Sequence, residues 1–166
     1  MKKRILVLSV LLFASTNGVS QANWNSFSSE TGKFSVNSSG NISESSRTTD
    51  KSTSFKITIL DGNMSYLISS THHQNDLESD IDNLLSTSIN SFSQSVKGDI
   101  ISQHDVERGN SKGKYADVLF DEGEVRLAYF VFIKGLYQYQ VMAYASKQFY
   151  NVEDANRFFR SFKILK

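Results

Sequence analysis

Residues 150–165 read YNVEDANRFFRSFKIL, and this stretch decides how the chain closes its core. At about 100° per helical residue, five apolar positions fall within an arc of about 120°: Val152, Ala155, Phe158, Phe159 and Phe162. Three basic positions lie outside that arc: Arg157, Arg160 and Lys163. The stretch therefore predicts a helix, capped by Asn151, that packs its phenylalanines onto a sheet. The alternative interpretation is a basic, aromatic surface that binds a ligand.

The sequence before this helix contains runs in which apolar and polar residues alternate, as in strands. Residues 24–36 predict a hairpin whose turn, residues 30–33, contains Gly32 at a position expected to need a positive φ. Residues 55–69 predict a second hairpin that turns at Gly62. Residues 37–54 are nearly all polar, which predicts an exposed edge strand or a mobile loop.

Residues 76–96 change to a helical period. The apolar positions form one stripe: Leu77, Ile81, Leu84, Leu85, Ile89, Phe92 and Val96. We expect Asn75 or Asp76 to cap this helix and Gly98 to end it. Ser88 lies inside the stripe, where its hydroxyl can bond to a carbonyl one turn back.

Four further strands are predicted at residues 100–106, 115–120, 125–133 and 136–145. The basic stretch RGNSKGK, residues 108–114, is interpreted as a hairpin loop because it does not open a helix. Residues 129–133 are apolar on both faces, which is typical of a strand covered on both sides. The order of elements predicts an α+β fold, an antiparallel sheet of about six to seven strands flanked by helices on both faces.

Three stretches also resemble the PsbP-like fold: FSSETGKFSV at 27–36, LYQYQVMAYA at 136–145 and DANRFFRSFKI at 154–164. The resemblance covers nearly all of residues 23–166 in the order of elements. It implies an α/β/α sandwich. Many members are exported bacterial proteins, and those with known roles mostly contact other macromolecules, so the resemblance implies a binding role rather than an enzymatic one.

The first 22 residues predict a cleaved secretory signal peptide. Residues 1–4 are basic after the first methionine, residues 5–14 are nearly all apolar, and small residues stand at Ser20 and Ala22. Cleavage after Ala22 leaves residues 23–166, which we interpret as a single PsbP-like domain, periplasmic or secreted. The apolar run is too short to span a bilayer, which needs ~20 residues, so we expect no stable membrane insertion after cleavage.

Charge argues against nucleic acid as a partner. Three of the 18 basic residues lie in the signal peptide, which leaves 15 against 17 acidic residues and a net charge of −2. A nucleic-acid binder needs a strongly basic surface. The chain also has no cysteine, so neither a disulfide nor a cysteine nucleophile is available.

The histidines do not predict a metal site. His72 and His73 are neighbours at a strand end, where side chains point to opposite faces, and His104 lies in another strand. If the strand has already ended, His73 and Asp76 could meet a metal, but solvated histidines are the expectation. We predict no catalytic, metal or cofactor site, and we interpret residues 121–124 as a solvated acidic turn.

The sequence therefore favours an exported, soluble, non-catalytic accessory or binding protein, with a protein partner in the cell envelope. The alternative is a small-molecule carrier or sensor with a pocket between sheet and helix. In that case the rim would include three tyrosines: Tyr137, Tyr139 and Tyr144. An enzymatic role ranks last.

Overall fold

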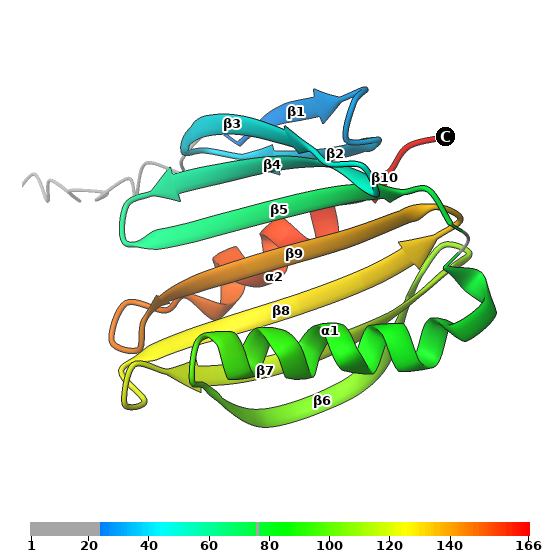
Figure 1. Cartoon of the computed structure of the whole chain (residues 1–166). Helices are drawn as coiled ribbons and strands as arrows, with labels where there is room; N and C mark the ends of the chain where they lie inside the picture. Colours follow the sequence, from blue (N-terminus) through cyan, green and yellow to red (C-terminus); the bar gives the residue numbers. More distant parts are fainter. Residues whose placement is uncertain (1–23, 76) are drawn as a thin grey trace, which may run out of the picture.

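The computed structural model describes residues 24–75 and 77–166, so the predicted signal peptide lies outside the described residues. The elements follow one another along the chain (Figure 1): β1 (Asn25–Ser29), β2 (Phe34–Ser38), β3 (Asn41–Thr48), β4 (Ser52–Asp61), β5 (Met64–His73), the 3₁₀ helix η1 (Glu78–Asp80), α1 (Ile81–Ser95), β6 (Asp99–Arg108), β7 (Ser111–Phe120), β8 (Val125–Lys134), β9 (Tyr137–Ser146), α2 (Val152–Ser161) and β10 (Lys163–Ile164).

Seven of these strands form one antiparallel sheet in the order β3-β4-β5-β9-β8-β7-β6. Three others form a smaller antiparallel sheet in the order β1-β2-β10. The predicted α+β class and the size of the main sheet are confirmed. Residues 37–54 contain the edge strand β3, which agrees with the first of the two interpretations given for that stretch.

The buried side chains form two separate cores, and β8 contributes to both. Its residues Leu127, Tyr129, Val131 and Ile133 pack with α1 in one core. The residues between them, Ala128 and Phe132, pack in the other core with α2 and the small sheet. Successive strand residues point to opposite faces, so a strand that contributes to two cores is apolar on both faces, as the sequence predicted for residues 129–133.

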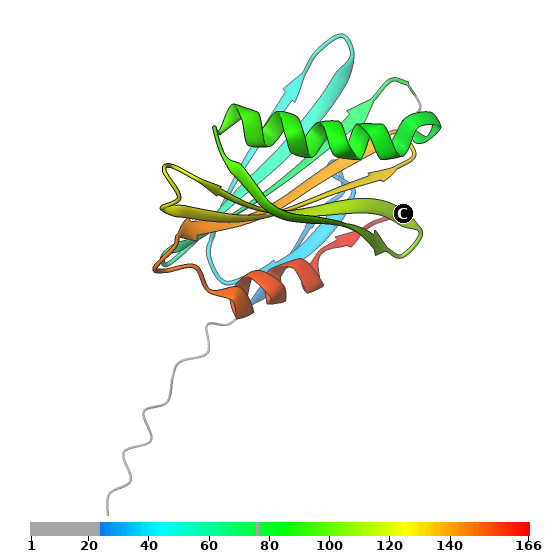
Figure 2. The same cartoon turned by 90° about the horizontal axis from the view of Figure 1, so that it is seen from below.

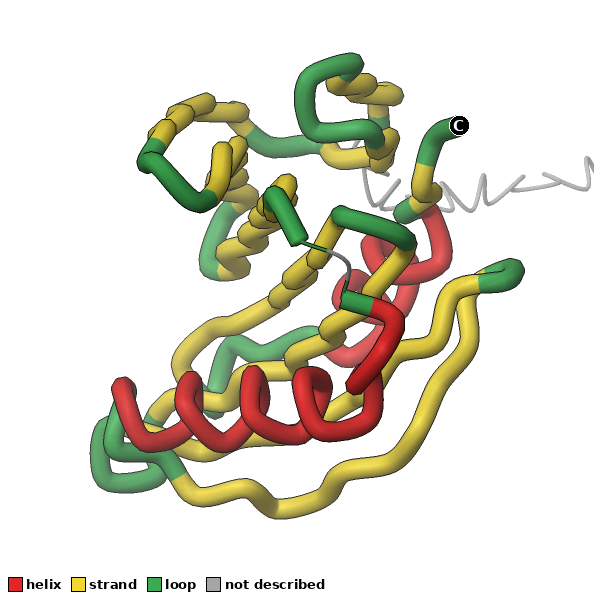
Figure 3. The backbone as a smooth tube through the Cα atoms, turned by 45° about the vertical axis from the view of Figure 1, so that its right-hand side comes forward, coloured by secondary structure: helices red, strands yellow, loops and turns green. Residues whose placement is uncertain are grey.

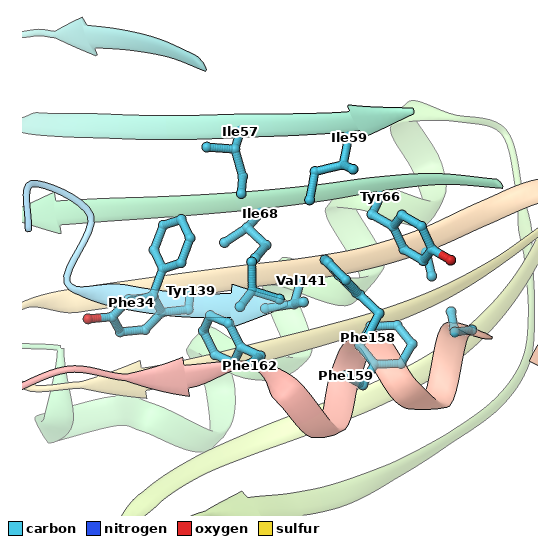
Figure 4. Packing of buried hydrophobic residues seen from close by; sticks show 14 of the residues in the cluster. Phe34, Ile57, Ile59, Tyr66, Ile68, Tyr139, Val141, Phe158, Phe159 and Phe162 are labelled. Atoms are coloured by element: carbon cyan, nitrogen blue, oxygen red, sulfur yellow. The ribbon is translucent and has the colours of Figure 1, made fainter. Parts of the chain in front are cut away.

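The terminal helix α2 is a core element, as its phenylalanines predicted. Phe158 and Phe162 are fully buried, and Figure 4 shows Phe158 beside Tyr66 of β5, with ring centroids 4.4 Å apart. Asn151 caps the helix through its Oδ1, which accepts hydrogen bonds from the backbone nitrogens of Glu153 and Asp154. One predicted core position is wrong: Val152, in the first turn, is 48% exposed.

The helix α1 begins later than predicted. It starts at Ile81 after η1, so the predicted cap at Asn75 is wrong. The N-cap residue is Asp80, and its side chain makes no capping hydrogen bond. The alternative cap, Asp76, lies outside the described residues. The helix then runs unbroken beside the main sheet (Figure 3), and Ser88 donates its hydroxyl proton to the carbonyl of Leu84, as expected.

Three turns differ from the sequence prediction. In the first hairpin Lys33, not Gly32, has the positive φ. Glycine is needed at position 32 because a Cβ atom there would lie 2.6 Å from the Phe34 ring. At the end of α1 the positive φ belongs to Lys97 rather than Gly98. The predicted loop 108–114 is shorter than expected, because β6 ends at Arg108 and β7 begins at residue 111.

The first hairpin forms as predicted, but it does not join the main sheet. Its strand β2 pairs with β1 on one side and with β10 on the other, so residues 163 and 164 complete the small sheet. Phe34 and Val36 of β2 are fully buried in the core that also holds the phenylalanines of α2. Within the described residues, no helix is long and apolar enough to cross a membrane.

Candidate ligand-binding pocket

A row of aromatic side chains crosses three strands of the main sheet. His104 of β6 pairs with Tyr115 of β7, and Tyr115 pairs with Phe130 of β8. The ring centroids are 4.9 Å apart in the first pair and 4.7 Å apart in the second. The row ends on α2, where the Phe159 ring lies 4.4 Å from Phe130. Strand register therefore places the rings of β6, β7 and β8 side by side, and α2 packs against the end of this row.

A cavity of about 300 Å³ lies along this row, and we call it the aromatic pocket. Ala128 stands two positions before Phe130 in β8, so it points to the same face and leaves more space than a larger side chain would. The pocket is lined by residues of the strands, of α2 and of the segment before α2: His104, Tyr115, Arg126, Ala128, Phe130, Tyr150, Val152, Asn156 and Phe159.

A single guanidinium group anchors the polar side of the pocket. Arg126 donates from Nε to Asp117 Oδ1 at 3.1 Å and from Nη2 to Oδ2 at 2.7 Å. Its Cζ lies 4.9 Å from the centre of the Tyr150 ring, so the guanidinium is held between a carboxylate and an aromatic face. The hydrogen bond to Asp117 raises the pKa of Arg126, which therefore stays charged.

The two phenols of the pocket are neutral hydrogen-bonding groups at ordinary pH. Burial raises the pKa of Tyr150 well above its usual value, with nearby Tyr115 as a smaller cause. Burial also raises the pKa of Tyr115, and Asp117 adds to the effect. A phenol with a raised pKa keeps its proton, so each hydroxyl can donate to a ligand as well as accept from one.

The rim of the pocket is apolar and exposed on the side of α2. Val152 lines the pocket and is 48% exposed, and Phe149, one residue before Tyr150, is 49% exposed. Asn156, one turn along the helix from Val152, is also exposed and brings an amide to the rim. The site thus combines aromatic walls, polar groups at defined positions and an apolar edge that faces solvent.

None of the three tyrosines predicted to rim a pocket lines the aromatic pocket. Tyr139 and Tyr144 differ by an odd number of positions in β9 and belong to different cores. Tyr139 is buried, and its hydroxyl donates to the carbonyl of Lys33 at 3.4 Å. The Tyr137 ring lies 4.7 Å from His72 in a tilted arrangement and stacks on Tyr139, with ring centroids 5.9 Å apart. The pocket tyrosines are instead Tyr115 and Tyr150.

The structure separates the three histidines. His72 contacts Tyr137, His73 ends β5, and His104 lines the aromatic pocket. The proposed meeting of His73 with Asp76 falls partly outside the described residues. In the part of the chain that the structure describes, no three histidine, aspartate or glutamate side chains are grouped so that they could hold a metal ion.

Two signals in the sequence could have indicated the pocket. Ala128 is the one small residue in the apolar stretch LAYFVFI, residues 127–133, and marks a gap in an otherwise bulky row. Phe149 and Tyr150 stand just before the cap of α2, where an aromatic pair is not required by the helix. Neither signal tells which strands meet there, because that depends on the register of β6, β7 and β8.

Comparisons with known proteins identify similar folds. The chain is similar to the solution structure of cyanobacterial PsbP (CyanoP) from Synechocystis sp. PCC 6803, with a TM-score of 0.58 and 11% identity over 92% of this chain and 98% of that one. It is also similar to a crystal structure from Bacteroides thetaiotaomicron VPI-5482, with a TM-score of 0.54, 17% identity and 85% of this chain covered. The chain spans 48% of that structure's length. No protein-family model and no curated protein matches the sequence.

Proposed function

We propose, from the PsbP-like fold that this chain shares with these structures, that it is an exported, soluble, non-catalytic accessory protein that binds another protein through the aromatic pocket. One observation carries this proposal. Val152, which lines the pocket, and Phe149, which precedes the lining residue Tyr150 in the chain, are each about half exposed. An exposed apolar edge around a concave site is typical of a surface that a second macromolecule covers.

The size of the pocket also favours a protein partner. Its volume, about 300 Å³, is at the lower end of the usual ~300–1,000 Å³ for small-molecule sites. A space of this size suits one large side chain of a partner. The partner's neighbouring residues would then also cover Phe149, which is not among the residues that line the pocket.

The charges in the pocket suit binding better than proton transfer. The guanidinium of Arg126 is already bonded to Asp117 by two hydrogen bonds, and raised pKa values keep Tyr115 and Tyr150 protonated. A general base works best when its pKa lies near the working pH. These groups would position a ligand by hydrogen bonds.

We also infer that the main sheet carries a helix on each face, as an α/β/α sandwich. Alternate residues of β8 pack with α1 and with α2, which supports this arrangement. The view in Figure 2, in which β8 and β9 run between α1 and α2, also supports it. The aromatic pocket would then lie where α2 leaves part of its face uncovered.

A small-molecule carrier or sensor is the second candidate. The aromatic row from His104 to Phe159 and the neutral phenols favour it, because flat aromatic ligands stack well on such walls. In that case the protein purified from its own exporting cells should carry a bound small molecule, visible as a defined added mass in native mass spectrometry.

Replacing both rim residues, Phe149→Ser and Val152→Ser, should weaken partner binding by about 5- to 30-fold, since two apolar interface contacts together contribute on the order of 1–2 kcal/mol. A photo-reactive amino acid at position 149 first identifies the partner by crosslinking in the cell envelope. The affinity of the purified pair is then measured for each variant.

The matched control is Leu60→Ser, because Leu60 is 60% exposed and is not among the residues that line the pocket. Its affinity for the partner should equal that of the unchanged protein. If the double rim variant binds as tightly as this control, the rim is not the interface. If the rim variant instead keeps a co-purifying small molecule and no crosslink forms at position 149, the carrier hypothesis replaces the first.

The export part of the proposal has its own test. Mass spectrometry of the protein recovered outside the cytoplasm should give the mass of a chain that begins at Asn23. The reason is the small-residue site at Ser20 and Ala22, which suits signal peptidase. Replacing Ala22 with a bulky residue, Ala22→Phe, should leave the precursor uncleaved. A recovered protein that retains residues 1–22 would disprove the expected cleavage.

A further inference from the structure

A second cavity, of about 480 Å³, lies beside the turn between β6 and β7. We call it the basic cup. Three of the described side chains that line it are cationic and none is acidic. Its lining residues are Arg108, Gly109, Asn110, Ser111, Lys134, Lys163 and Ile164. The sequence stretch RGNSKGK contributes four of these positions.

The cations of the cup form no ion pair with an acidic side chain in the part of the chain that the structure describes. Within residues 24–75 and 77–166, the ion pairs involve other basic side chains, namely Lys33, Lys114 and Arg126. Lys134 and Lys163 are exposed to solvent. Like charges that converge without a counter-charge repel one another, so an anion in the cup would relieve that repulsion.

Arg108 is the least hydrated of the three cations of the cup. Its Nη1 donates to the carbonyl oxygen of Phe162 at 3.0 Å, and its Cζ lies 5.7 Å from the centre of the Phe132 ring. Burial lowers the pKa of this guanidinium, which means that its charge has lost hydration. A guanidinium has five N–H donors and a planar edge that fits a carboxylate.

The basic cup and the aromatic pocket lie on the same face of the main sheet. In β6, His104 lines the pocket and Arg108 lines the cup. In β8, Phe130 lines the pocket and Lys134 lines the cup. Both pairs are four residues apart on one strand, so their side chains share a face and are separated by about 14 Å.

Between the two cavities, Val106 of β6 is partly exposed, whereas Gly113 of β7 and Phe132 of β8 are buried. Val106 stands midway between His104 and Arg108 and pairs with Gly113. The Phe132 ring occupies the space beside Gly113, because a Cβ atom there would lie 2.4 Å from it. Since β6 is the edge strand of the main sheet, an extended chain could pass from one cavity to the other along β6, over Val106.

We propose that the aromatic pocket and the basic cup together bind one extended, acidic peptide segment of a partner protein. The segment places an apolar or aromatic side chain in the pocket and a carboxylate in the cup. Side chains at positions i and i+4 of an extended chain point the same way and are also about 14 Å apart. The inference rests on the proposed function and adds the chemistry of the partner.

An anionic membrane surface fits the observations less well. A membrane-binding surface brings its cations and its exposed apolar side chains to one level, so that both reach the lipid. Here Phe149 and Val152 lie at the pocket end of α2, whereas Lys163 lies beyond the other end of that helix. A peptide that spans both cavities would place its apolar side chain and its carboxylate at these two separate positions.

The test selects random seven-residue peptides, displayed on phage, on the immobilised protein of residues 23–166. We expect enrichment of peptides with an aromatic residue and an aspartate or glutamate four positions apart, in either order. Fluorescence anisotropy then measures the selected peptides. The double variant Lys134→Gln and Lys163→Gln should bind them at least about ten-fold more weakly than the unchanged protein, and added salt should reduce this difference.

The matched control, Lys56→Gln with Lys97→Gln, changes the net charge equally at two exposed lysines that do not line the cup. It should bind the peptides normally. The inference is overturned if no such peptides are enriched, or if the cup variant binds them as well as the control. It is also overturned if the cup variant loses only its binding to phosphatidylglycerol vesicles. If the enriched peptides share only the aromatic residue and Phe149→Ser weakens their binding, the inference is overturned but the proposed function stands.

Discussion

Replacing Phe158 with alanine is expected to lower the free energy of unfolding by about 3–5 kcal/mol, the usual cost of removing a core phenylalanine. Phe158 is fully buried, and its ring lies 4.4 Å from Tyr66 and 5.9 Å from Phe159. It thus joins α2 to β5. Since domains of this size are stable by only ~5–15 kcal/mol, the variant should unfold at much lower urea concentration.

The control for this prediction is Arg160→Ala on the same helix. Arg160 is exposed, so its replacement should change the free energy of unfolding by less than about 0.5 kcal/mol. Arg157 is a less neutral control than its sequence position indicates, because its guanidinium lies 4.5 Å above the Trp24 ring. A Phe158→Ala protein as stable as Arg160→Ala would show that α2 does not hold the core.

Phe159→Ala should cost a similar amount of stability but also change binding. Phe159 is buried, and it also lines the aromatic pocket. Phe158 is therefore the cleaner position for a test of packing alone. A Phe159→Ala protein that folds normally and loses its partner would mean that α2 is chiefly a binding surface.

The second large effect is expected at Gly113→Ala. A Cβ atom at this position would lie 2.4 Å from Cδ1 of Phe132 and 2.6 Å from the carbonyl oxygen of Val131. The carbonyl belongs to the backbone of β8 and cannot move without disturbing the sheet. We expect a loss of about 1–3 kcal/mol, as for overpacked cores, although alanine is otherwise preferred to glycine in a strand.

Urea unfolding of Gly113→Ala beside Lys112→Ala tests this expectation. Lys112 is exposed on the same strand, so its replacement should be nearly neutral. In NMR spectra, the ring protons of Phe132 should shift in the glycine variant and stay unchanged in the lysine variant. Equal stability of the two variants would show that β7 and β8 can separate enough to accept a methyl group.

The elements with strong periodicity could be predicted from the sequence, and their ends could not. The arc of α2 is correct for Ala155, Phe158 and Phe159, because a buried helix needs apolar residues at those spacings. The predicted burial of Val152 was wrong because the first turn of the helix extends to the rim of a cavity. The predicted start of α1 was wrong because the apolar residue Leu77 continues the helical pattern into a segment that is not α-helical.

Features that depend on distant pairing left little signal in the sequence. Strand β10 has two residues and pairs with β2, more than 120 residues earlier in the chain, so no local period indicates it. Gly32 was expected to provide a positive φ, whereas its lack of a side chain leaves room for the Phe34 and Phe55 rings. The aromatic pocket likewise depends on the register of three strands and on the path of α2.

The pairing of β2 with β10 also bears on the order in which the chain can fold during synthesis. The edge of β2 that takes β10 cannot be paired until residues 163 and 164 have left the ribosome. The α2 phenylalanines, which share a core with Phe34 of β2, arrive almost as late. The core that contains Phe34 therefore stays incompletely packed until the C-terminal segment has been made. For the export proposed above, this delay would help the nascent chain to stay open enough to thread through a translocation channel.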